Sequence, residues 1–226
     1  MDRTARARLL AGMMRLLAIG ARNAGAVAVA SGRWLTETVV DLAPHIPVRD
    51  LATLREHHRG LSGDQLAAAL VANAAKATGA VGAAGGVLSS VEFAAPPTLL
   101  VSSPVQIAAE TIAVVSIELK LIAELHEVYG RPVVGTPAVR TAAYLGAWTR
   151  RRGIDPMEAT AGLPNVLGGA ARRELRRRLV RRAGSNATTS LPFLAGAVAG
   201  ASLNSRETRR LGDRIVRDLG GRLHRS

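Results

Sequence analysis

The sequence predicts an all-α protein that folds as a single-domain, Ala/Gly-rich helical bundle. Three observations favour this class: helix start and stop signals recur, Ala-rich stretches favour helix, and no stretch of four or more residues alternates as a strand does. The 226 residues, 48% of them hydrophobic, are enough to bury a core. Only 3% are aromatic, so small aliphatic side chains must fill that core and the helical hairpins must pack tightly.

Capping patterns place the individual helices along the chain. Ser62 with Gln65 has the spacing of a capping box, and Thr136-Pro137 places proline at the first helical position. Gly130 stands where a helix would stop. The predicted helices cover residues 2–42, 50–59, 63–91, 104–129, 137–152, 156–162, 166–183, 191–203 and 206–219. We divide the chain into an N-terminal helical segment, 1–45, and a main helical domain, 46–226.

The net charge of +13 is confined to the C-terminal part of the chain. Residues 1–130 are neutral overall, whereas residues 131–226 contain 19 arginines and six acidic residues. The absence of cysteine excludes disulfides, Cys-ligated metals and thiol catalysis. Walker-type and dinucleotide-binding glycine motifs are also absent, so we expect no cofactor. No secretory signal is visible, and we expect a cytoplasmic protein at the inner face of the membrane.

Arginines cover most of the helix predicted over residues 166–183, around a narrow stripe of Leu175 and Leu179. A surface of this kind suits anionic lipid headgroups or an acidic protein surface. Nucleic acid is a rival partner, although the helix has no interleaved aromatic residues for base stacking. A solvated helix is the plain alternative. The candidate anion-binding residues are Arg150, Arg151, Arg152, Arg172, Arg173, Arg176, Arg177, Arg181 and Arg182.

Two segments, 77–91 and 183–205, contain no charged residue and are rich in glycine. Each contains a GxxxG motif, which is typical of close helix contact both in membranes and in Ala-rich soluble bundles. Tight packing in a soluble core and shallow insertion into lipid therefore both stay open. The glycines predicted to serve either purpose are Gly79, Gly82, Gly86, Gly196 and Gly200.

Glu110 and Glu118 are the best acid–base candidates, because their neighbours one helical turn away are mostly apolar. Burial raises a carboxyl pKa and suits it to general acid or base catalysis. Pairing inside the bundle is the alternative, and we favour it. Glu124 and Glu127 are expected on an exposed face with Lys120. No metal site is expected, since His126-Glu127 lacks the second histidine of a zincin motif.

The order of these features resembles the EcsC family over about residues 60–220. The resemblance rests on the glycine-rich run 77–86, the acidic, proline-containing turn from Glu92 to Pro97, the helix end at 127–130, and the segment 191–200 followed by Asn204. That family often has Asp-Leu-Pro where this chain has Glu92 and then Pro96-Pro97. The resemblance implies a helical protein, allows membrane association, and supplies no catalytic residue, because the family has no established reaction.

Together these observations predict a non-catalytic, EcsC-like helical protein that associates with an anionic membrane surface or an acidic protein partner through its Arg-rich C-terminal part. An enzyme that uses buried Glu110 and Glu118 is the first alternative. Non-specific nucleic-acid binding is the second.

Overall fold

A computed structural model describes residues 12, 19–20, 38–39, 41–93, 103–151 and 193–220. Within these ranges the regular elements are helices and there is no strand, so the predicted all-α fold is confirmed. The predicted helices over 156–162 and 166–183 lie outside the described residues, as does most of 2–42. In chain order the elements are the 3-10 helix η1 (Ala43–His45) and the α-helices α4 (Leu51–His57), α5 (Gly63–Phe93), α6 (Ser103–Val128), α7 (Pro137–Arg151) and α9 (Phe193–Asp218).

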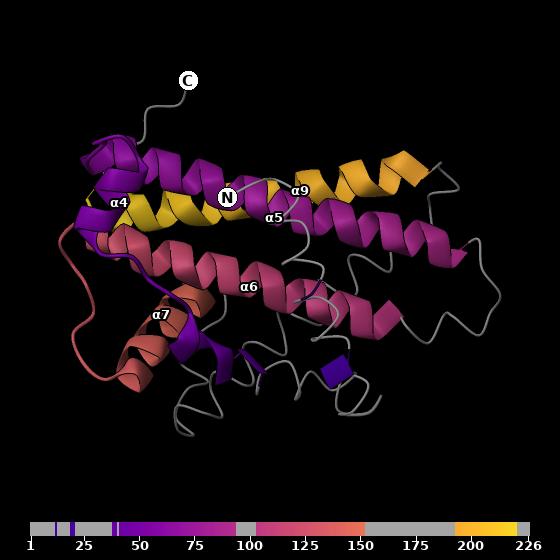
Figure 1. Ribbon diagram of the computed structural model, residues 1–226, viewed down its shortest axis with the longest axis horizontal. Coiled ribbons are helices and arrows are strands. Elements are labelled where there is room, and N and C mark those ends of the chain that lie inside the picture. Colours follow the sequence, from indigo (N-terminus) through magenta and orange to yellow (C-terminus); the bar gives the residue numbers. More distant parts are fainter. Residues whose placement is uncertain are drawn as a thin grey trace.

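The three longest described helices, α5, α6 and α9, form an elongated bundle (Figure 1). Helix α9 runs antiparallel to α5 along its length, α6 packs beside α5, and α7 crosses α6 at a steep angle. The C-terminal end of α5 and the N-terminal ends of α6 and α9 therefore lie at one end of the bundle. We call residues 77–93, 103–109 and 193–205 the distal end; α4 lies at the opposite end.

Backbone contact between two glycines holds α5 against α9. A Cβ atom added to Gly82 would lie 2.3 Å from the carbonyl oxygen of Gly200, and one added to Gly200 would lie 2.4 Å from that of Gly82. Gly79 packs less closely, with a Cβ position 3.3 Å from the Ala201 oxygen. Only glycine permits the approach at Gly82 and Gly200. The side-chain surroundings of Gly86 and Gly196 lie outside what the structure describes.

The face of α9 that contacts α5 repeats every four residues. Gly212 packs on Val71, a Cβ at Gly212 falling 2.6 Å from Val71 Cγ2. Between Gly200 and Gly212, the same face carries Asn204 and Thr208, both buried. A spacing of four residues keeps side chains on one side of a helix, so small and polar residues form the whole stripe that faces α5.

Most of the hydrophobic core lies toward the end of the bundle that contains α4. Its largest fully buried side chains come from five helices and include Leu54, Leu66, Ile122, Leu125, Leu145 and Leu211. A second, smaller cluster nearer the distal end consists of Val81, Ala113 and Val114. The large aliphatic side chains thus gather at one end, and small residues occupy the other, where α5 and α9 approach most closely.

One predicted helix boundary is wrong. The sequence predicts separate helices over 191–203 and 206–219, whereas α9 is continuous from Phe193 to Asp218. Asn204 is unfavourable in a helix interior when its side chain competes for the local backbone. Here its side-chain amide donates to the Glu110 carboxylate on α6 instead, so the helix continues through the polar position.

Replacing Gly82 with Ala tests the close approach of α5 and α9. The added methyl group would overlap the Gly200 carbonyl, and we expect a loss of about 2 kcal/mol of unfolding free energy. Gly79→Ala is the matched control. Its added methyl group meets a looser contact, and the cost of that contact is offset by the ~1 kcal/mol that alanine gains over glycine in helix propensity, so we expect little change in stability. Urea unfolding followed by circular dichroism measures both; equal stability of the two variants would contradict the contact.

Candidate functional site

The distal end consists of three helix segments that are almost free of charged residues. Residues 77–91 of α5, 103–109 of α6 and 193–205 of α9 contain no Asp, Glu, Lys or Arg. On α9 this stretch exposes large apolar side chains, with Val198 66% and Leu203 50% accessible to solvent. Glu92, near the end of α5, is the acidic residue beyond these stretches. Val198 and Leu203 are the large apolar side chains that the described part of α9 exposes.

Basic residues mark the inner boundary of the distal end. Lys76 on α5 and Arg206 on α9 are the first charged residues there, and both are exposed. Because Gly82 faces Gly200 and Val71 faces Gly212 in this antiparallel pair, Lys76 and Arg206 lie at about the same height along the bundle. We call these two residues the basic boundary. A charge-free surface next to exposed cations is complementary to a surface with anionic headgroups over hydrocarbon.

A buried hydrogen-bond network joins four helices at the inner boundary of the distal end. Its centre is Glu118 on α6, which is fully buried. Trp148 Nε1 of α7 donates to Glu118 Oε2 at 2.8 Å, and Thr208 Oγ1 of α9 lies 2.9 Å from Glu118 Oε1. Thr78 Oγ1 of α5 lies 2.9 Å from Thr208 Oγ1 and extends the chain to the fourth helix. Both Glu118 oxygens thus have donors within the bundle, as a buried carboxylate requires.

Glu110 is buried one level nearer the distal end, with 4% of its surface exposed. Asn204 Nδ2 donates to its Oε1 at 3.1 Å. Neither Glu110 nor Glu118 lines the cavity described below. The hydrogen bonds to both carboxyl groups join helices, and their donors are the neutral side chains of Trp148, Thr208 and Asn204. The second oxygen of Glu110, Oε2, is buried without a hydrogen-bond donor among the described residues.

Sequence reasoning did not select Thr78, Thr208 or Trp148. A signal for Thr208 exists, because it continues the four-residue spacing of Gly200 and Asn204 along α9. Nothing comparable marks Trp148, whose role depends on how α7 crosses α6. Hydrogen-bond partners that lie on separate helices can be identified only from the packed structure, because no local sequence pattern links them.

Glu124 corrects the prediction of an exposed acidic face. The side chain is buried, with 3% exposed, and its two oxygens accept hydrogen bonds from Arg49 Nε and Nη2, both at 2.8 Å. Lys120 Nζ lies 2.7 Å from Glu124 Oε1 and also donates to the Pro47 carbonyl. Burial by itself raises the pKa of Glu124, but the hydrogen bonds from Arg49 and Lys120 outweigh it and leave that pKa below its usual value. The cluster ties residues 47–49 to α6.

A hydrogen bond near α4 joins the start of α5 to the end of α6. Tyr129, just after α6, donates its hydroxyl to Asp64 Oδ1 at 2.7 Å. Burial and the neighbouring Asp64 carboxylate raise the pKa of Tyr129, so the phenol stays protonated and remains a donor.

The candidate arginines fall mostly outside the described residues. Arg150 and Arg151 form the C-terminal end of α7, where cations suit the helix dipole. Arg152 lies outside the described residues, and so does the whole set Arg172, Arg173, Arg176, Arg177, Arg181 and Arg182. In the described part of α9, Arg206, Arg209 and Arg210 are exposed. The positive charge of the C-terminal part therefore extends to the segment of α9 that directly follows the distal end.

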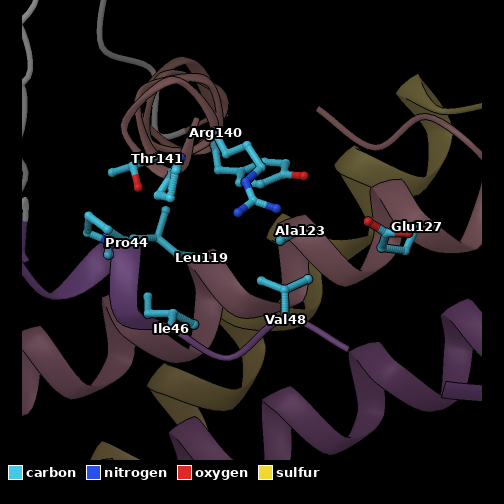
Figure 2. A pocket seen from close by; sticks show the side chains of 11 residues that line it. Pro44, Ile46, Val48, Leu119, Ala123, Glu127, Arg140 and Thr141 are labelled. Carbon is cyan, nitrogen blue, oxygen red and sulfur yellow. The ribbon is translucent and has the colours of Figure 1, made fainter. Parts of the chain in front are cut away.

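A cavity of about 150 Å³ lies between η1, α6 and α7 (Figure 2). Its floor is mainly apolar, whereas Arg140 and Glu127 bring opposite charges to its lining. The described residues contain no group of three or more side chains that could hold a metal ion. The lining residues are Ala43, Pro44, Ile46, Val48, Leu119, Ala123, Glu127, Pro137, Arg140, Thr141 and Tyr144.

One described helical stretch, Gly63–Ala84, is long and apolar enough to cross a bilayer, with a mean hydropathy of 1.3. Of its apolar window, 56% is buried inside the bundle, which is also the pattern of a core helix in a soluble protein. Length and composition alone therefore do not separate these two cases.

No family model, no curated protein and no solved structure matches this chain. The resemblance to the EcsC family stays a prediction that rests on the residues quoted above.

Removing either donor to Glu118 tests the buried network. We expect Trp148→Phe and Thr208→Val each to lower the unfolding free energy by about 2 kcal/mol, because each leaves a buried carboxylate oxygen without its donor. Thr141→Val, a half-buried position on α7, is the matched control and should change stability by less than about 0.5 kcal/mol. Denaturant titration measures all three. The network would be contradicted if Trp148→Phe and Thr208→Val each lowered the unfolding free energy by no more than Thr141→Val does.

The Glu124 cluster predicts a specific loss of stability in acid. Because the pKa of Glu124 in the folded protein is below the ordinary glutamate value of 4.5, its contribution to stability is present above about pH 4.5 and is lost as the pH falls through the lower, folded value. At neutral pH we expect Glu124→Gln to be less stable than wild type by about 2 kcal/mol, and the gap to close in acid. Unfolding free energy measured against pH tests this. Glu127→Gln is the control, and a gap for Glu124→Gln that does not depend on pH would refute the prediction.

Proposed function

We propose that this protein is a non-catalytic, EcsC-like peripheral membrane protein that binds the anionic inner face of the cytoplasmic membrane through its distal end and its C-terminal arginines. One observation carries the proposal: the charge-free parts of α5, α6 and α9 gather at one end of the bundle, and exposed Lys76 and Arg206 border it. Acidic side chains at that boundary would oppose such binding, and the first exposed charges on α5 and α9 are basic.

The dimensions favour shallow insertion. At 1.5 Å per residue, the charge-free stretch of α9 is about 20 Å long, less than the ~30 Å of a hydrocarbon core. Val198 and Leu203, both exposed on the solvent side of α9, supply apolar groups that can be buried ~5–10 Å into the headgroup boundary. Glu92 near the end of α5 opposes passage of the tip through the hydrocarbon, so we assign the contact to the exposed side of α9.

Arginines supply the electrostatic part of the attachment. Arg206, Arg209 and Arg210 follow the apolar stretch of α9 directly, and the Arg172–Arg182 segment precedes it in the chain. Each basic side chain close to an anionic surface contributes about 1 kcal/mol at low salt. Several such contacts together with a small apolar insertion give reversible binding whose strength depends on salt.

The buried carboxylates support a structural role rather than catalysis. A catalytic acid or base must reach a substrate, but both oxygens of Glu118 accept hydrogen bonds from side chains of α7 and α9. The same network fixes the three helices whose ends form the apolar surface. A rigid distal end reduces the entropy lost when it binds, which is a reason for a binding module to bury such a network.

Co-sedimentation with vesicles tests the proposal. We expect wild type to bind phosphatidylglycerol-containing vesicles and not pure phosphatidylcholine vesicles, with binding that weakens as salt increases. A variant with Arg172, Arg173, Arg176, Arg177, Arg181 and Arg182 changed to Gln should lose most of the binding to anionic vesicles. Val198→Glu with Leu203→Glu should lose the part of the binding that survives high salt.

The matched control for the apolar contact is Val134→Glu with Val139→Glu. These two valines are 88% and 52% exposed, and they lie outside the distal end, so the control should bind like wild type. The proposal would be refuted if wild type did not bind anionic vesicles, or if the Val198/Leu203 and Val134/Val139 double variants lost binding equally. Salt-sensitive binding to a DNA duplex in place of vesicles would favour the nucleic-acid alternative.

A further inference from the structure

The cavity between η1, α6 and α7 combines an apolar floor with a cationic side chain directed into it. In Figure 2 the Arg140 guanidinium points into the space above Leu119 and Ala123, with Val48 on its far side. Ile46 and Pro44 close the floor at another side. A pocket whose lining residues are mostly apolar, with a few polar groups that orient the ligand, is the usual form of a small-molecule site.

Arg140 has no ion-pair partner within the part of the chain that the structure describes. The ion pairs found there join Arg49 and Lys120 to Glu124, and Arg210 to Glu207. Glu127 lines the same cavity, but Figure 2 places its carboxylate at one edge, away from the Arg140 guanidinium. A guanidinium that lines a cavity without a carboxylate partner can form charge-assisted hydrogen bonds with a bound anion.

The surroundings of Arg140 add to the preference for an anion. Pro137, at the start of α7, also lines the cavity, and the first turn of this 15-residue helix contains no acidic residue. The amino-terminal end of a helix carries partial positive charge, which acts in the same direction as the guanidinium. Tyr144, which closes the cavity on α7, is held by an edge contact with His126 at 5.4 Å between ring centres.

We propose that this cavity binds a small amphiphilic carboxylate, whose anionic group contacts Arg140 and whose short hydrocarbon chain lies on Leu119, Ala123 and Ile46. The volume limits the chain: a cavity of about 150 Å³ holds a ligand about the size of benzene, so roughly six carbon atoms fill it. The ligand is thus a short-chain carboxylate from solution, too small to be a membrane lipid. The site is separate from the distal end and does not depend on membrane binding.

Titration of full-length protein with hexanoate, followed by saturation-transfer NMR, tests the proposal. We expect saturable binding and a loss of about tenfold in affinity for Arg140→Gln, with Arg131→Gln, an exposed arginine outside the cavity, as the unchanged control. Hexanol should bind wild type about as weakly as hexanoate binds Arg140→Gln. Affinity should increase from butanoate to hexanoate and then level off at octanoate.

Glu127→Gln separates an anion site from a zwitterion site. If the ligand is an anion, removing the nearby negative charge leaves hexanoate binding unchanged or strengthens it. Weaker binding of hexanoate to Glu127→Gln would overturn the proposal, as would equal affinity of wild type and Arg140→Gln or the absence of saturable binding to wild type. Circular dichroism of each variant confirms that the exposed substitutions leave the fold intact.

Discussion

The contact between the backbones of Gly82 and Gly200 is the constraint on which the rest of the structure depends. It brings α5 and α9 together so closely that no side chain fits between them at that point. Farther along the same pair of helices, the short side chains of Thr78 and Thr208 can then reach one another. The contact also sets the register that places the charge-free halves of both helices at the same end. A larger residue at Gly82 would push apart both the polar network and the distal end.

Glu118 is the second constraint, because it links α6 to two other helices. A buried carboxylate is costly unless donors surround it, and Trp148 and Thr208 reach it only when α7 and α9 are correctly packed. Small aliphatic side chains alone can pack in several registers with similar energy. The hydrogen bonds to Glu118 favour one of them. The Ala/Gly-rich part of the bundle therefore has a defined arrangement despite its shortage of large core side chains.

The sequence predicts the helices well because their signals are local. The predicted 63–91, 104–129 and 137–152 differ from α5, α6 and α7 by one or two residues at an end, since capping residues and glycines act within one turn. Contacts between helices are not local, and the sequence does not show that Gly82 faces Gly200 or that Trp148 reaches Glu118. Three further differences have the same cause. The sequence predicts a helix break near Asn204, where α9 is continuous, and an exposed Glu124, which is buried. It also gives no indication of the cavity between η1, α6 and α7.

The buried carboxylates and the apolar distal end are connected by a single requirement. On α6, Glu110 directly follows the distal segment and Glu118 lies about two helical turns farther inward. An acidic side chain costs about 3 kcal/mol where it faces hydrocarbon. Enclosing Glu110 and Glu118 between helices removes both carboxyl groups from the outer surface. Thr208 and Trp148 donate to the two oxygens of Glu118, and Asn204 donates to Oε1 of Glu110. The outer face of α9 is then free to carry Val198 and Leu203. A polar interior and an apolar exterior at this end are thus two consequences of the same packing.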